Sequence, residues 1–147
     1  YTGYSAICLA RGLKPGGKLI TLEINDELND LSDEYFRKAG LEKQIERING
    51  NALDILPSLK QKFDLAFIDG EKEQYIEYYQ SILPKLNKNG VIIADNVLWD
   101  GKVLGEKNKR DSTTQAICDF NVFVQKDQSV DNLILPLRDG LMLIFRK

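Results

Sequence analysis

Two apolar segments of the chain end on side chains that could bind a metal ion. FDLAFID ends on Asp69, and GVIIADN ends on Asp95 and Asn96. Nearly continuous apolar runs are typical of strands buried on both faces of a parallel sheet, whose carboxyl ends open on one edge. Two carboxylates and an amide oxygen suit a hard cation, Mg²⁺ first, with Ca²⁺ or Mn²⁺ as alternatives. We therefore predict a divalent-metal site at these residues; the competing interpretation is that Asp69 only caps the following helix.

A lysine lies close to the first of these acids in the sequence. Lys72 follows Asp69 by three residues and is expected to project into the same pocket. The chain contains no histidine, which excludes Ser-His-Asp and Cys-His catalysis and leaves Lys, Asp, Glu or Tyr as the general base. Lys72 is our candidate base. The alternative is an ordinary solvated lysine.

A glycine-bearing turn and a later acid resemble parts of a nucleotide site. Tyr1–Ser5, with Gly3 at its centre, leads into a helix whose first backbone N–H groups could bind a carboxylate or phosphate. Glu23 ends the segment KLITLEI about 20 residues later, where an acid commonly binds ribose hydroxyls. An ordinary turn and a surface acid are the alternatives. A ribose contact alone would not separate NAD from S-adenosylmethionine.

The elements that must position these residues alternate between helix and strand. Strands are predicted at 18–24, 45–49, 63–69, 90–95, 132–137 and 141–146, and helices at 4–13, 26–39, 51–60, 73–86 and 113–125. This order predicts an α/β fold with a doubly wound, mostly parallel sheet. Asp139-Gly140 between the last two strands predicts a closing antiparallel hairpin. Such folds place a strand before the glycine turn, so we expect residues 1–147 to be a single, N-terminally truncated domain that lacks its first strand.

Composition excludes several classes of partner. The chain has 147 residues, 43% of them hydrophobic, and a formal net charge of −2, which gives no reason to expect a nucleic-acid or anionic-membrane partner. No apolar run approaches the roughly 20 residues that span a bilayer, and no secretion signal is visible. Cys8 and Cys118 are interpreted as reduced thiols. We therefore expect a cytoplasmic protein.

Five motifs along the chain resemble those of the cation-dependent class I O-methyltransferases, which include the catechol and caffeoyl-CoA types: YTGYSA, LEIN, FIDGEKEQY, IIADNVLWDGKV and LPLRDGLML. The resemblance covers essentially the whole chain. It implies a Rossmann-like methyltransferase fold with S-adenosyl-L-methionine as methyl donor. It also implies that Asp69, Asp95 and Asn96 bind the metal, that Lys72 and Asp69 are catalytic, and that Asp69 borders the cofactor as well.

The same resemblance implies the remaining site residues. Glu23 would bind the ribose, and Trp99 would border the pocket of the aromatic substrate. The methionine part of the cofactor would lie at Gly3, Tyr4 and Ser5, and the adenine beside Gly50, Asn51 and Ala52, mainly through the backbone. The N-terminal helices that help form the acceptor pocket and a homodimer contact in this family would precede Tyr1.

The expected function is therefore metal-dependent O-methylation of a vicinal dihydroxy aromatic. A nicotinamide-dependent oxidoreductase of the same fold class and a non-catalytic nucleotide-binding domain are the alternatives.

Overall fold

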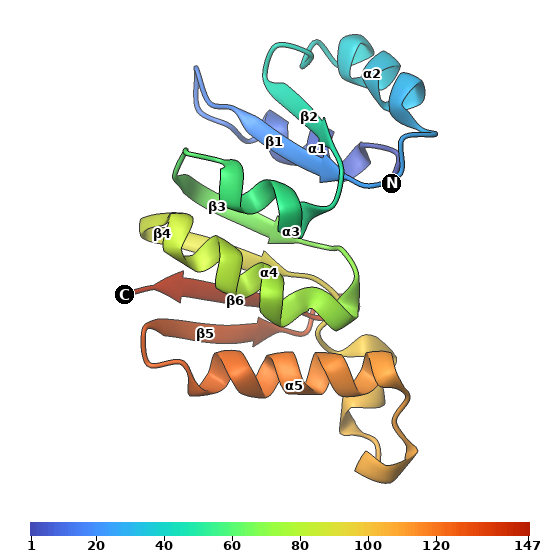
Figure 1. Ribbon diagram of the computed structural model, residues 1–147, viewed down its shortest axis with the longest axis vertical. Helices are drawn as coiled ribbons and strands as arrows, with labels where there is room; N and C mark the ends of the chain where they lie inside the picture. The colour runs from blue at the N-terminus through green and yellow to red at the C-terminus, as the bar shows by residue number, and fades with distance from the viewer. The chain divides into compact units, whose positions relative to one another are not determined.

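The computed structural model describes residues 1–147 (Figure 1). The chain divides into two compact units, Tyr1–Ser58 and Leu59–Lys147, and each is described by itself. The alternation of helices and strands along the chain is as predicted.

The first unit contains a small parallel sheet. Its elements are α1 (Tyr4–Arg11), β1 (Leu19–Glu23), α2 (Asn29–Lys38), β2 (Ile45–Asn49), α3 (Ala52–Ile55) and a 3-10 turn at Leu56–Ser58. β1 and β2 run parallel, and Glu23 lies opposite Asn49 at their carboxyl ends. A small apolar core packs beside this sheet and contains Ala6, Ala10, Phe36, Leu41 and Ile45. The register therefore brings Glu23 to the edge from which the chain continues toward α3.

Helix α2 is shorter than predicted, and Phe36 is its one buried apolar residue. The helix ends before Gly40, which has a φ of 69°, and the next N–H, of Leu41, donates to the Phe36 carbonyl at 2.9 Å. Phe36 is buried, but Leu31 and Tyr35 are 38% and 47% exposed. The side of α2 that faces the core therefore carries Phe36 and the small Ser32.

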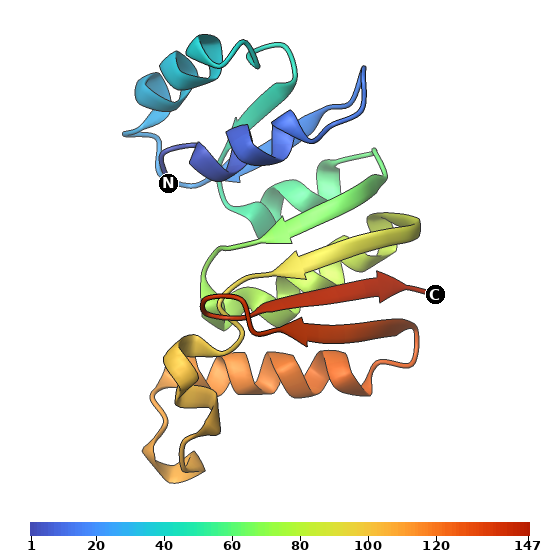
Figure 2. The same ribbon diagram turned by 180° about the vertical axis from the view of Figure 1, so that it is seen from behind.

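The second unit contains a mixed four-stranded sheet. Its strands are β3 (Phe63–Ile68), β4 (Leu86–Ala94), β5 (Val130–Leu135) and β6 (Leu141–Arg146), and its helices are α4 (Tyr75–Ile82) and α5 (Ser112–Lys126). The strand order is β3-β4-β6-β5, with β3 and β4 parallel and both contacts of β6 antiparallel. The predicted closing hairpin is confirmed, and Figure 2 shows its second strand between β4 and β5.

The core of the second unit lies where α4 and α5 pack together. The ring of Phe120 on α5 makes edge-to-face contacts with Tyr75 and Tyr79 of α4, at centroid distances of 5.3 and 6.4 Å. Beneath them, Ile92 of β4 lies opposite Ile144 of β6, and both are fully buried. This packing fixes the start of α4 against the ends of β3 and β4, where the candidate site lies.

Short 3-10 turns account for most differences from the predicted boundaries. The helix predicted at 73–86 is α4 flanked by turns at Lys72–Gln74 and Leu83–Lys85, the latter containing Pro84, which cannot donate a backbone hydrogen bond. The turns at Trp99–Leu104 and Lys107–Lys109 were not predicted. The longest helix has 15 residues. No helix combines the length and hydropathy that crossing a bilayer requires.

Candidate functional site

The structure places the two predicted metal-binding segments side by side at the ends of β3 and β4. Ile68 pairs with Ala94 in parallel register, and the Asp95 N–H donates to the Ile68 carbonyl at 3.0 Å. Asp69 and Asp95 thus leave neighbouring strands at the same edge. The sheet geometry that predicted their proximity is confirmed, whereas the metal role itself stays a prediction.

Lys72 is held within this edge and is not a solvated lysine. Its Nζ lies 3.2 Å from Oδ1 of Asp69 and 2.7 Å from the hydroxyl of Tyr75. Only 11% of its side chain is exposed. The ammonium also lies 4.9 Å from the Tyr75 ring centroid and 6.0 Å from that of Trp99. The alternative of a free surface lysine is therefore wrong.

Tyr75 connects the lysine to both strand ends, a role that was not predicted. It is fully buried, and its hydroxyl donates to the carbonyl of Asp95 at 3.1 Å, with the carbonyl of Ile68 at 3.4 Å. Burial, with smaller contributions from Asp69 and Asp95, raises the pKa of Tyr75 well above its usual value, so the phenol stays protonated. Its position three residues after Lys72, where side chains share a helix face, was the available signal.

Asp69 does not act as a helix cap. The 3-10 turn that begins at Lys72 has Glu71 at its N-cap position and no side-chain capping bond. The Asp69 carboxylate, 46% exposed, is instead paired with Lys72. The capping interpretation is therefore not supported.

Asn96 presents its amide in a defined orientation. Its backbone has a φ of 58°, a left-handed conformation that asparagine tolerates better than most residues. Its N–H donates to Oδ1 of Asp95 at 2.7 Å, and its Nδ2 donates to Oδ2 of Asp139 at 3.2 Å. The amide oxygen makes no hydrogen bond within the chain. Asp139 was predicted only as part of the hairpin turn, and nothing in the local pattern indicated this longer contact.

The hairpin turn also holds the loop that carries Trp99. Val97 and Leu98 donate backbone hydrogen bonds to the carbonyls of Gly140 and Asp139, at 3.1 and 3.0 Å. The Asp100 N–H donates to Oδ1 of Asp139. Trp99 and Asp100 have φ values of 47° and 52°, so two successive non-glycine residues adopt the left-handed region. Trp99 is half-buried, with the ammonium of Lys102 5.9 Å from its ring centroid.

The donor atoms of this edge suit a hard divalent cation. Asp69 and Asp95 supply carboxylate oxygens, and Asn96 supplies an amide oxygen that its hydrogen bonding leaves available. No group of three or more Asp, Glu, Cys or His side chains with metal-binding geometry occurs in the structure. A cation here would therefore depend on the mixed set of two carboxylates and one amide.

The predicted ribose and adenine residues lie together in the first unit. The Gly50 N–H donates to the Glu23 carbonyl at 2.9 Å, and the Asn25 N–H donates to Oε1 of Glu23 at 2.9 Å. Asn51 caps α3 by accepting from the Leu53 N–H at 2.9 Å. The Asn51 side-chain oxygen is thereby committed to local structure, and the adenine contact of this loop stays a prediction.

The predicted methionine-binding turn begins α1 in the same unit. Gly3 has a φ of 79°, and a Cβ atom there would lie 2.7 Å from Cε1 of Phe36. Only glycine fits both constraints. Tyr4 and Ser5 are exposed first-turn residues, and no side chain caps this helix. Free backbone N–H groups at a helix start can donate hydrogen bonds to an anionic group, and this role of the turn stays a prediction.

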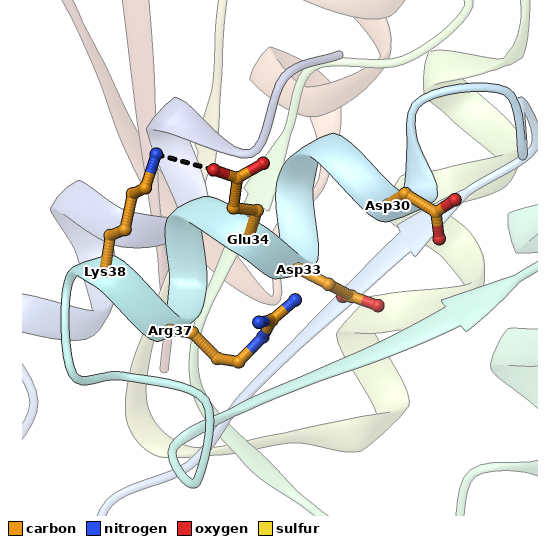
Figure 3. A pocket seen from close by; sticks show the side chains of 5 residues that line it. All are labelled: Asp30, Asp33, Glu34, Arg37 and Lys38. Carbon is orange, nitrogen blue, oxygen red and sulfur yellow. Dashed lines mark ion pairs between the residues drawn. The ribbon is translucent and has the colours of Figure 1, made fainter.

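A charged hollow lies on α2, and none of the predicted site residues lines it. Asp30, Asp33, Glu34, Arg37 and Lys38 line it (Figure 3). Lys38 pairs with Glu34 at 2.6 Å across one helix turn. All five residues come from one exposed helix, so the hollow has the composition of a solvated helix surface.

Comparisons with known proteins agree on the family. A protein-family model described as O-methyltransferase matches residues 1–147. The chain is 39% identical to a catechol O-methyltransferase of Niastella koreensis, covering 99% of this chain and 69% of that protein. It is 34% identical to catechol O-methyltransferase domain-containing protein 1 of mouse, covering 99% of this chain but 57% of that protein.

Solved structures are similar over the whole chain. The O-methyltransferase TomG of Streptomyces achromogenes, crystallised with S-adenosylmethionine, superimposes with a TM-score of 0.92 at 29% identity, covering 100% of this chain and 70% of that one. An O-methyltransferase of Bacillus cereus in complex with S-adenosylhomocysteine gives a TM-score of 0.90 at 30% identity, covering 99% and 70%. The predicted fold class and the class of enzyme are confirmed at the level of the family. The chain belongs to the O-methyltransferase family.

Proposed function

We propose that the protein transfers a methyl group from S-adenosylmethionine to one hydroxyl of a vicinal dihydroxy aromatic, with a divalent cation bound by Asp69, Asp95 and Asn96. The observation that carries the proposal is the placement of the Lys72 ammonium 3.2 Å from the Asp69 carboxylate, where β3 and β4 end together. A base beside acidic oxygen ligands is the arrangement that deprotonation of a metal-bound hydroxyl requires.

In its neutral amine form, Lys72 would accept the proton of the attacking hydroxyl at Nζ and become the ammonium that pairs with Asp69. Its stem is buried, and the Tyr75 hydroxyl and the Asp69 carboxylate limit where Nζ can lie. The new oxygen–carbon bond forms as the sulfur–carbon bond of the donor breaks, leaving a methyl ether and S-adenosylhomocysteine. A bound cation would supply stabilisation of the negative charge that develops on the acceptor oxygen. Holding both reactants in line can contribute about 7–11 kcal/mol to the rate.

The donor would be bound by residues of the first unit. Glu23 would accept hydrogen bonds from the ribose, and the uncapped start of α1 would bind the carboxylate of the methionine part. Backbone groups of Gly50, Asn51 and Ala52 would contact the adenine. The donor or its product is named in two of the similar solved structures, which supports this assignment.

A catechol-like acceptor is proposed from the acceptors that appear in the names of the similar proteins. The similar proteins include catechol O-methyltransferases and caffeoyl-CoA O-methyltransferases, and their namesake acceptors share a dihydroxyphenyl ring. Trp99, half-buried and within 6.0 Å of the Lys72 ammonium, offers an aromatic face for such a ring.

The test is a methyl-transfer assay with the full-length gene product. Catechol and caffeoyl-CoA should be methylated, while an acceptor that retains one free hydroxyl beside a methoxy group should react poorly. EDTA should abolish turnover, and Mg²⁺ should restore it. Turnover that survives rigorous chelation would remove the cation from the proposal. Calorimetric binding of NAD in place of S-adenosylhomocysteine would instead favour the oxidoreductase alternative.

A cytoplasmic location and a homodimer are further proposals. The location is supported by Cys8 and Cys118, which form no disulfide. Cell fractionation and light scattering of the full-length protein would test them.

A further inference from the structure

We propose that Asp139 is a positioning residue that determines which atom of the Asn96 amide faces the bound cation. The inference rests on the proposed metal site. Oδ2 of Asp139 lies 3.2 Å from Nδ2 of Asn96, and both side chains are partly buried. Asp139 lies in the β5–β6 hairpin, distant in sequence from the strand end that it contacts.

The chemistry of the two groups determines the orientation. An ionised carboxylate only accepts hydrogen bonds, whereas an amide has a donating NH₂ end and an accepting oxygen end. Asn96 must therefore turn its NH₂ toward Asp139, and its oxygen faces away from that carboxylate. Only the oxygen can bind a cation. A reversed amide would present N–H donors to the cation and would leave two oxygens in contact at Asp139.

Asp139 is itself held in place by the loop that carries Asn96. Its Oδ1 accepts from the Asp100 N–H, and its carbonyl accepts from the Leu98 N–H at 3.0 Å. The following residue, Gly140, has a φ of 84°, and a Cβ atom there would lie 2.4 Å from Cγ of Leu98. The close approach at this glycine brings the turn against the loop. The carboxylate therefore has a fixed position from which to orient Asn96.

A general bracing role for Asp139 can be separated from this orienting role. The Leu98 and Val97 N–H groups donate to the backbone carbonyls of Asp139 and Gly140. A substitution of the Asp139 side chain therefore leaves both hydrogen bonds intact. Asp139→Asn keeps an oxygen for the Asp100 N–H but places an NH₂ group opposite Nδ2 of Asn96. Two donors would then face each other unless the Asn96 amide turns over. Turning over would direct its NH₂ toward the cation.

The experiment measures Mg²⁺ affinity by calorimetry in the full-length protein with S-adenosylhomocysteine bound. Asp139→Asn should weaken Mg²⁺ binding by about 10- to 100-fold, the range that loss of a supporting contact to a metal ligand produces. The affinity for S-adenosylhomocysteine without metal should stay within about threefold, since the substitution leaves the first unit unchanged. The matched control is Asp100→Asn. It removes one carboxylate from the loop that carries Asn96, at a left-handed position that asparagine tolerates.

A second pair of variants tests the amide directly. A carboxylate presents an oxygen in either orientation, so Asn96→Asp should make the metal site insensitive to residue 139. The double variant Asn96→Asp with Asp139→Asn should bind Mg²⁺ at least as tightly as Asn96→Asp alone. The second substitution also removes the repulsion between the two facing carboxylates at positions 96 and 139.

The outcomes separate the two proposals. Absence of Mg²⁺ binding by the unmodified protein would overturn the metal site and, with it, this inference. If the unmodified protein binds Mg²⁺ and Asp139→Asn binds it equally well, the metal site stands and the positioning role is wrong. An equal loss in Asp100→Asn would assign the effect to charge alone. A loss in Asp139→Asn that persists in the Asn96→Asp background would show that Asp139 does not act through the amide.

Discussion

The hydroxyl of Tyr75 lies 2.7 Å from Nζ of Lys72 and 3.1 Å from the carbonyl of Asp95, so one buried phenol joins the candidate base to the end of the neighbouring strand. Tyr75 is anchored in turn by its edge-to-face contact with Phe120. The position of the lysine therefore depends on the packing of α4 against α5 as well as on its own ion pair.

Replacing Tyr75 by phenylalanine should lower kcat and leave donor binding unchanged. The ring packing is kept, but Lys72 loses one of its two polar contacts. A lost hydrogen bond of about 0.5–1.5 kcal/mol corresponds to a 2- to 10-fold decrease in kcat. Tyr79→Phe is the matched control, because Tyr79 also packs on Phe120 but bonds Asp127 at 2.7 Å, away from the lysine. Equal effects of both variants on kcat would contradict the assignment.

Replacing Lys72 by methionine should reduce kcat by about 10²- to 10⁴-fold, the range of general-base catalysis, with little change in affinity for S-adenosylhomocysteine. Lys102→Met is the control, since Lys102 also lies over Trp99 but is exposed and contacts neither Asp69 nor Tyr75. In the Lys72→Met background, Tyr75→Phe should cause no further loss, because both residues act through one proton acceptor. Multiplicative losses would mean that Tyr75 acts independently of the lysine.

Gly140→Ala should destabilise the second unit more than Gly101→Ala does. Both glycines have left-handed φ values, 84° and 73°, so each substitution carries a backbone cost of about 1–2 kcal/mol. At Gly140 the added Cβ also meets Leu98, whereas at Gly101 nothing lies within 4 Å. Thermal unfolding followed by circular dichroism would compare them. Equal melting temperatures would show that the turn and the loop do not approach as closely as described.

The carboxylate of Asp127 should make the folding stability of the second unit sensitive to acid. Hydrogen bonds from the Ser129 hydroxyl and N–H, and then from Tyr79, lower the pKa of Asp127 below its ordinary value. A lowered folded-state pKa gives stability that is present above about pH 4, the ordinary value for aspartate, and is lost as the pH falls through the folded-state pKa. Asp127→Asn should therefore melt at a lower temperature than the unmodified protein at pH 7, and the difference should shrink toward pH 3. A difference that stays constant with pH would contradict this; Asp26→Asn, at an exposed position, is the control.

The sequence predicted the parts of the site that follow from strand periodicity. Asp69 and Asp95 end two apolar runs, and parallel pairing alone brings such ends together. Tyr75 and Asp139 were missed because their roles depend on tertiary contacts. A tyrosine in an apolar stripe is the same pattern whether or not its hydroxyl meets a lysine, and an Asp-Gly turn gives no indication of the loop it will contact. Helix periodicity likewise does not reveal that Tyr35 is exposed, because its burial depends on how wide a face the neighbouring strands cover.

The left-handed backbone at Trp99 and Asp100 has a consequence for how acceptor range can change, in the laboratory or in evolution. A randomised library at position 99 should lose valine, isoleucine and threonine through misfolding before any acceptor is offered, because branched side chains disfavour this backbone. Glycine and asparagine should be enriched for the same reason, whatever the acceptor. New specificities should therefore arise more readily at positions with ordinary backbone angles than at the tryptophan itself.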